Sequence, residues 1–176
     1  DDADGRMRGR LGGEVLAAGW LGGRLSERGR GLAAELGERR RDDGVDAVYA
    51  SDLARAVETA EIAFGATGIP VRLDWRLREV DYGELNGASV AAVTEVRRAH
   101  VDEPFPGGES YRQVVERTRA FLDDVAPRHD GERVLVIAHS ANRWALQHLL
   151  DGAPLEELVD APFDWQPGWM YELDSG

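Results

Sequence analysis

The chain has 176 residues, 43% of them hydrophobic and 31% charged, which fits one soluble domain spanning residues 1–176. Its net charge of −12 argues against non-specific nucleic-acid binding, and no stretch approaches the roughly 20 apolar residues of a membrane span. The absence of cysteine excludes disulfides, thiolate catalysis and cysteine-bound metals. Since the chain opens without a basic start or an apolar run, we expect no secretory signal, and the lack of cysteine makes a cytoplasmic protein the default expectation.

In the first half of the chain, short β-prone runs alternate with helical patterns. Ser26 is a suitable N-cap, and the pair at 51–52 is predicted to cap the following helix. The predicted elements are a mostly irregular segment over 1–24, a helix over 26–41, a strand over 45–49, a helix beginning after 51–52, a strand over 70–73 and an irregular loop over 76–87.

The second half continues the alternation and contains the clearest helical period in the chain. The continuous apolar run at 133–138 is typical of a parallel strand buried on both faces. The predicted elements are a helix over 89–99, a loop over 104–108, a helix over 109–128, a strand over 133–138, a helix ending near 150 and a last strand over 168–173.

This alternation predicts an α/β fold: a three-layer sandwich in which helices cover both faces of a mostly parallel central sheet. Ligands of such folds bind where strands end and helices begin. Two junctions therefore stand out, at residues 50–52 and 138–140.

His139 follows the apolar strand and precedes a predicted helix N-terminus, a position that favours anions. The alternative is a histidine that only hydrogen-bonds loop backbone. Arg55 lies in the first turn of its helix, where the macrodipole disfavours a cation unless both serve a shared anion. Thr59, one turn along, would support that anion. A solvated surface arginine is the alternative for Arg55.

Two carboxylates have weaker cases. Glu79, in a glycine-ended loop between apolar residues, is a candidate general acid, although on its own the segment is preferably interpreted as a surface turn. Glu109 is expected in the first turn of the long helix, where it complements the dipole. No histidine pair has HxxxH or HExxH spacing and no nucleotide-binding glycine motif occurs, so we expect neither a metal nor another cofactor.

Together these segments resemble histidine phosphatases of the phosphoglycerate-mutase-like superfamily, in the same order from about Gly19 to Ala145. The matching segments are GW at 19–20 with LSERG at 25–29 ("GW…PLTERG"), YASDLARA at 49–56 with TA at 59–60 ("SSDLxRAxxTA"), LREVDYG at 77–83 ("LREidfGxxEG", with Asn86 replacing the second acid), PGGES at 106–110 ("PGGES") and VLVIAH at 134–139 ("vlvVsHg").

The resemblance implies a two-step phosphoryl transfer through a phosphohistidine. It makes Arg55 an arginine that holds the phosphoryl group, His139 the second histidine and Glu79 the proton donor. It also implies that Ser51, Ser140, Glu109 and Trp20 contact the substrate. Fixed cations and donors suit this chemistry, because charge spreads over the equatorial oxygens of the transferred group.

The chain departs from the family pattern at the nucleophilic histidine. The family spacing puts an Arg-His-Gly turn near Arg6 or Met7, where no histidine occurs, and residues 1–5 cannot form the apolar strand that precedes it. Three explanations stay open: the strand and histidine lie upstream of Asp1, the N-terminus is degenerate, or another chemistry occupies the pocket. We favour the first, because losing a central strand exposes the edges of its neighbours.

The sequence therefore predicts a phosphatase that acts on a small phosphorylated metabolite, with mutase activity a less favoured variant. The alternative is a degenerate protein that binds phosphate or another anion without turnover. A third hypothesis gives His139 and Glu79 acid–base work without phosphohistidine. Residues 84–108 and the aromatics from Trp165 to Trp169 are expected to set selectivity, although for Trp169 the preferred interpretation is a C-terminal strand that packs its aromatics on the core. The sequence defines no oligomeric state.

Overall fold

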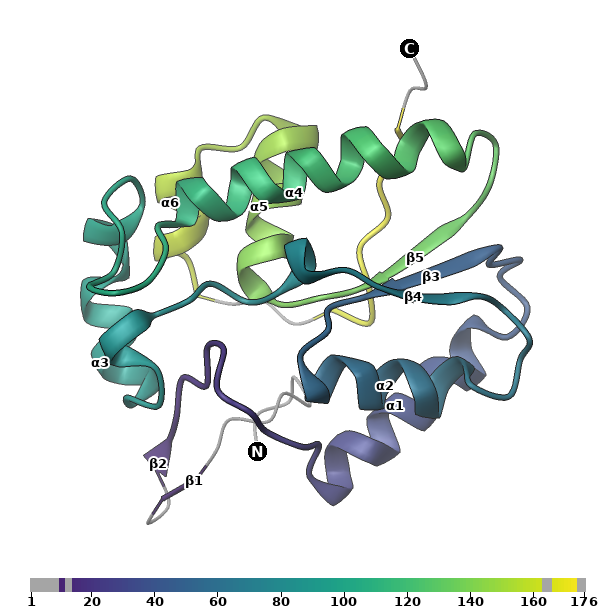
Figure 1. The fold of residues 1–176 in the computed structure, drawn as a ribbon, viewed down its shortest axis with the longest axis horizontal. Helices are drawn as coiled ribbons and strands as arrows, with labels where there is room; N and C mark the ends of the chain where they lie inside the picture. Colours follow the sequence, from purple (N-terminus) through teal and green to yellow (C-terminus); the bar gives the residue numbers. More distant parts are fainter. Residues whose placement is uncertain (1–9, 12–13, 163–165, 174–176) are drawn as a thin grey trace.

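The computed structural model describes residues 10–11, 14–162 and 166–173. Figure 1 shows three layers, with a sheet lying between one pair of helices and a second group of helices. The strands are β3 (Ala47–Ala50), β4 (Val71–Leu73) and β5 (Val134–Ile137), the lower helices are α1 (Glu27–Arg40) and α2 (Ala54–Phe64), and the upper helices are α4 (Tyr111–Val125), α5 (Ser140–Asp151) and α6 (Leu155–Asp160). The expected α/β sandwich is confirmed.

The sheet is parallel, in the order β4-β3-β5. Ala50 at the end of β3 is in register with Leu73 on one side and with Ile137 on the other, so all three strands end at one edge. The four residues of β3 are buried, as the apolar composition of a central strand requires. Among the described residues, β5 pairs with β3 alone, and its residues stay partly exposed.

The lower helices start differently from one another. Ser26 caps α1 as predicted, because its Oγ accepts a hydrogen bond from the Gly29 N–H at 3.1 Å. The prediction that 51–52 caps α2 is wrong, since Leu53 is the N-cap and supplies no side-chain acceptor. The Asp52 carboxylate instead binds Arg78 from another segment, a long-range ion pair that no local pattern reveals.

The upper layer contains the most regular helix. Ser110 and Gln113 form a capping box at the start of α4, and Val114, Val115 and Phe121 lie on its buried face. Glu109 precedes the N-cap, so its expected place in the first turn is wrong; it forms an ion pair with Arg117 instead. The short helix α6 was not predicted from the sequence.

The remaining segments connect the layers. Helix α3 (Val90–Val96) begins at the cap residue Ser89 and continues into a 3₁₀ turn (Arg97–His100). Near the start of the chain, β1 (Arg10–Leu11) and β2 (Glu14–Val15) form a small antiparallel pair within a segment predicted to be mostly irregular. In the part of the chain that the structure describes, no helix combines the length and apolarity needed to cross a membrane.

The strand expected over 168–173 is wrong. Residues 166–173 as described contain no strand, and the Trp169 ring lies 4.5 Å from the guanidinium carbon of Arg143 in α5. The segment therefore packs its aromatic side chain on a helix instead of pairing its backbone with the sheet.

Candidate active site

The two junctions identified in the sequence lie side by side at the carboxyl edge of the sheet. The Ser51 N–H donates a hydrogen bond to the Ile137 carbonyl at 3.0 Å, which ties the end of β3 to the end of β5. His139 follows directly as the N-cap of α5 and is 8% exposed. The parallel register thus places the start of α2 and the start of α5 at one opening.

A cavity of about 100 Å³ lies at this opening. Arg55, Glu79, His139 and Ser140 all line it, from segments of the chain up to 85 positions apart (Arg55 to Ser140). The lining also includes Val90, Tyr111 and Trp144, together with a second arginine, Arg97, whose guanidinium carbon lies 5.6 Å from the centroid of the Trp144 ring. The lining thus combines two cations, an imidazole and a carboxylate with apolar and aromatic side chains.

The Glu79 carboxylate is fixed at the start of α5. Its Oε1 accepts hydrogen bonds from the Val80 N–H at 3.0 Å and the Ala141 N–H at 3.1 Å, and Ser140 Oγ lies 3.4 Å from Oε2. Glu79 as a whole residue is 7% exposed. Backbone donors at a helix N-terminus hold a carboxylate well, and these contacts keep Glu79 in the lining of the cavity.

Arg55 reaches across to the segment that precedes α1. Its Nη2 donates to the Gly19 carbonyl at 2.9 Å, which places the guanidinium against residues that also line the cavity. Thr59 does not join it: Thr59 Oγ1 donates to the Arg55 carbonyl at 2.8 Å within the helix. The expectation that Thr59 supports the anion is therefore not met by this geometry.

An ion pair beside the cavity was missed by the sequence interpretation. Arg78 Nε and Nη2 donate to the two Asp52 carboxylate oxygens at 2.7 and 2.6 Å, and these bonds hold the pKa of Asp52 below its ordinary value. The same guanidinium lies over the Trp20 ring, 4.7 Å from its centroid. Among 21 arginines, sequence alone gave no reason to pair these three residues.

Three other predicted contact residues lie near the cavity without lining it. Ser51 is fully buried, and its Oγ accepts from the Leu53 N–H at 3.2 Å. Trp20 donates its indole N–H to the Glu79 carbonyl at 2.6 Å. Glu109 accepts two hydrogen bonds from Arg117. Ser140, by contrast, lines the cavity as predicted.

Two buried aromatic side chains of the cavity lining, Tyr111 and Trp144, were not identified as site residues from the sequence. Tyr111 is 1% exposed, and burial raises the pKa of its hydroxyl above the ordinary value. It therefore stays protonated at any physiological pH. Trp144 packs edge-on against it, with ring centroids 5.6 Å apart.

The chain's other three histidines lie elsewhere: His100 stacks on Phe105, His129 Nε2 is 3.0 Å from the Tyr49 hydroxyl, and His148 Nδ1 is 2.8 Å from the Ala153 carbonyl. No group of three or more His, Asp or Glu side chains within the described ranges can hold a metal ion.

Two sequence predictions fall outside the described residues. These are the expected nucleophile position at Arg6 or Met7 and the selectivity role of Trp165. Trp169, the other end of that aromatic segment, is described and does not line the cavity.

Comparisons with known proteins agree with this architecture. Residues 8–171 match the family model of the histidine phosphatase superfamily (branch 1). The probable phosphoglycerate mutase GpmB of Salmonella typhi is 34% identical over 138 residues, which is 74% of this chain and only 64% of that relative. The match therefore spans less than two thirds of the relative's length.

Solved structures give the same result. Bacillus stearothermophilus YhfR has a TM-score of 0.74 at 30% identity, over 86% of this chain and 79% of that one. The mycobacterial glucosyl-3-phosphoglycerate phosphatase has a TM-score of 0.73 at 28% identity, over 82% of this chain and 76% of that one. With its parallel sheet, its pocket at the carboxyl edge and a family match over nearly its whole length, the chain belongs to the histidine phosphatase superfamily.

Proposed function

We propose that this chain is a phosphatase domain whose cavity binds the phosphoryl group of a small phosphorylated metabolite. One observation carries the proposal: Arg55, Glu79, His139 and Ser140 line a single small cavity at the start of α5. A cation, an imidazole and a helix N-terminus converging on one space suit a tetrahedral anion. A structure of the mycobacterial phosphatase is a complex with inorganic phosphate, and that protein is 27% identical to this chain.

In the proposed reaction, Arg55 and His139 hold the equatorial oxygens of the phosphoryl group while charge builds up on them. Glu79 protonates the oxygen of the leaving alcohol. Because Oε1 already accepts two N–H bonds, Oε2 is the oxygen suited to carry that proton. Ser140 Oγ, near Oε2, orients it.

The nucleophile in this scheme is a second imidazole, which forms a phosphohistidine that water then hydrolyses. The chain contains four histidines, and none precedes His100. Of these four histidines only His139 lines the cavity, so the described residues do not supply the attacking imidazole. The described residues would then bind the phosphoryl group and supply the proton.

The absence of a histidine before His100 also favours a second candidate function. With no histidine near Arg6 or Met7, the cavity of this chain would bind phosphate or another anionic ligand without turnover. Arg55 and His139 would have the same binding role in this case, whereas Glu79 would have no leaving group to protonate.

Turnover of an aryl phosphate by the protein at its native length separates the two candidates. A phosphatase releases phosphate from p-nitrophenyl phosphate, and the His139→Ala variant loses this activity by about a hundredfold or more. Activity that survives His139→Ala unchanged would exclude the proposed pocket. Phosphate binding with no release of p-nitrophenol would select the binding function.

A further inference from the structure

A buried ion pair lies behind the segment that carries Glu79, and neither of its members lines the cavity. Arg117, in the middle of α4, donates from Nε and Nη2 to the Glu109 carboxylate at 3.0 and 3.1 Å. The side chains of Arg117 and Glu109 are 6% and 18% exposed. A pair buried to this degree loses hydration, so it needs further hydrogen bonds to be stable.

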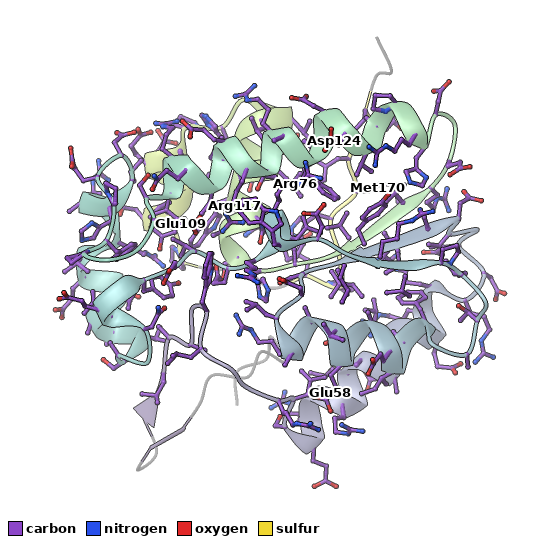
Figure 2. All side chains as sticks on the ribbon, viewed as in Figure 1. Glu58, Arg76, Glu109, Arg117, Asp124 and Met170 are labelled. Atoms are coloured by element: carbon purple, nitrogen blue, oxygen red, sulfur yellow. The ribbon has the colours of Figure 1, made fainter. Side chains whose placement is uncertain are left out.

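Those further bonds go to the main chain around Glu79. Arg117 Nη1 donates to the Arg76 carbonyl at 2.5 Å, and Nη2 also donates to the Glu79 carbonyl at 3.0 Å. Figure 2 shows Arg117, Arg76 and Glu109 below α4, where the chain passes from β4 toward α3. The planar guanidinium thus holds two carbonyls three residues apart at fixed positions.

Glu109 completes the arrangement from the other end of the segment. Its Oε2 accepts a hydrogen bond from the Asp81 N–H at 3.1 Å. The segment from Arg76 to Asp81 has only a short 3₁₀ turn at its start, so few hydrogen bonds of its own fix the backbone of Glu79. On its opposite side the Glu79 carbonyl accepts the Trp20 indole N–H.

We propose that Arg117 and Glu109 are positioning residues that aim the Glu79 carboxylate into the cavity. Each fixes the backbone on one side of Glu79, and a rotation of that backbone would remove the carboxylate from the start of α5. The chemical consequence, proton delivery to the leaving group, rests on the proposed phosphatase function. The orientation of the Glu79 carboxylate at the start of α5 does not rest on that function, and it can be measured separately.

Amide hydrogen exchange measures the geometric consequence in the full chain. The Val80 and Ala141 N–H groups are protected by the Glu79 carboxylate. In Arg117→Lys, which keeps the charge but cannot hold both carbonyls, both amides should exchange about tenfold faster relative to the other amides of α5. Glu109→Gln should act in the same direction and serves as the second variant if the lysine variant does not fold.

Ser110→Ala is the matched control. It weakens the cap of α4 on the same helix as Arg117 and touches neither Glu79 nor its carbonyl. If α4 acted only as a scaffold, the control and the two ion-pair variants would speed exchange of Val80 and Ala141 equally. That result, or unchanged exchange in folded Arg117→Lys and Glu109→Gln, would overturn the proposal.

A comparison of leaving groups measures the chemical consequence. Loss of a positioned acid slows the hydrolysis of phosphate esters of alcohols more than that of nitrophenyl phosphate. An alcohol needs a proton in order to leave, whereas nitrophenol leaves as its anion. Arg117→Lys should therefore reduce turnover of glycerol phosphate about tenfold more than turnover of p-nitrophenyl phosphate, as should Glu79→Gln. If the protein at its native length turns over neither ester, the phosphatase function fails, and the exchange experiment alone still decides the positioning role.

Discussion

The Trp20 indole N–H donates to the Glu79 carbonyl at 2.6 Å, although the two residues lie 59 positions apart. This bond joins the segment before α1 to the segment that carries the proposed proton donor. The Arg78 guanidinium lies over the Trp20 ring, so the ring is held on its face as well as at its edge.

Replacing Trp20 tests this connection. Trp20→Phe keeps an aromatic face for Arg78 and removes the only hydrogen-bond donor of the side chain. Because the Glu79 carbonyl still accepts from Arg117, we expect the free energy of unfolding to fall by only about 1 kcal/mol, measured by urea denaturation. Unchanged stability in this variant would show that the hydrogen bond has no energetic role.

The Asp52–Arg78 pair predicts a pH dependence of stability. The pKa of Asp52 is lower in the folded than in the unfolded chain, chiefly because Arg78 donates hydrogen bonds to it. The pair therefore stabilises the fold above the unfolded pKa of about 3.9, and this stability is lost as the pH falls through the folded pKa.

Asp52→Asn removes the titrating group. At pH 7 its free energy of unfolding should lie below that of the wild type by up to about 1 kcal/mol, because solvent screens a partly exposed pair. Urea denaturation from pH 7 down to about pH 3 should show the difference shrinking. A difference that grows toward acid pH would give the opposite sign and contradict the assignment.

Gly83 is predicted to tolerate no side chain. Its φ of +54° is strained for other residues, and a Cβ there would collide with the Pro106 carbonyl oxygen and lie 2.6 Å from the Gly108 nitrogen. Gly83→Ala should therefore lower the free energy of unfolding by about 3 kcal/mol or more.

Gly107→Ala is the matched control. Gly107 also has a positive φ, of +72°, but no atom lies within 4 Å of a Cβ built on it. Only the backbone strain applies, so denaturation should show a loss of about 1–2 kcal/mol. Equal losses of unfolding free energy in the two variants would mean that the close approach of residues 83 and 106–108 has no effect on stability.

The parallel sheet and its two junctions were predictable because they depend on local signals. The apolar run before His139 and the alternation around Tyr49 specify neighbouring strands, and parallel strands end at one edge. The ion pairs of Asp52 with Arg78 and of Glu109 with Arg117 were not predictable. The first joins segments 26 positions apart. The second spans eight positions around the start of α4, beyond the three- and four-residue spacing of helix neighbours. The sequence also offers 21 arginines as partners.

The strand expected over 168–173 failed for a related reason. Alternating aromatic and apolar residues favour a strand only where a neighbouring strand is available for pairing. In the structure Trp169 packs on Arg143 instead, and Gly168 lies close to the Arg40 side chain of α1. Tertiary contacts with two helices thus override the local preference.

Binding of orthovanadate, a tetrahedral anion that resembles phosphate, tests the central claim most directly. Isothermal titration calorimetry of the chain should show one saturable site, with affinity reduced at least about tenfold in Arg55→Ala and in His139→Ala. Arg119→Ala, on the exposed face of α4, should bind like the wild type. Wild-type affinity in both the Arg55 and the His139 variant, or an equal loss in Arg119→Ala, would contradict a shared anion site at the carboxyl edge of the sheet.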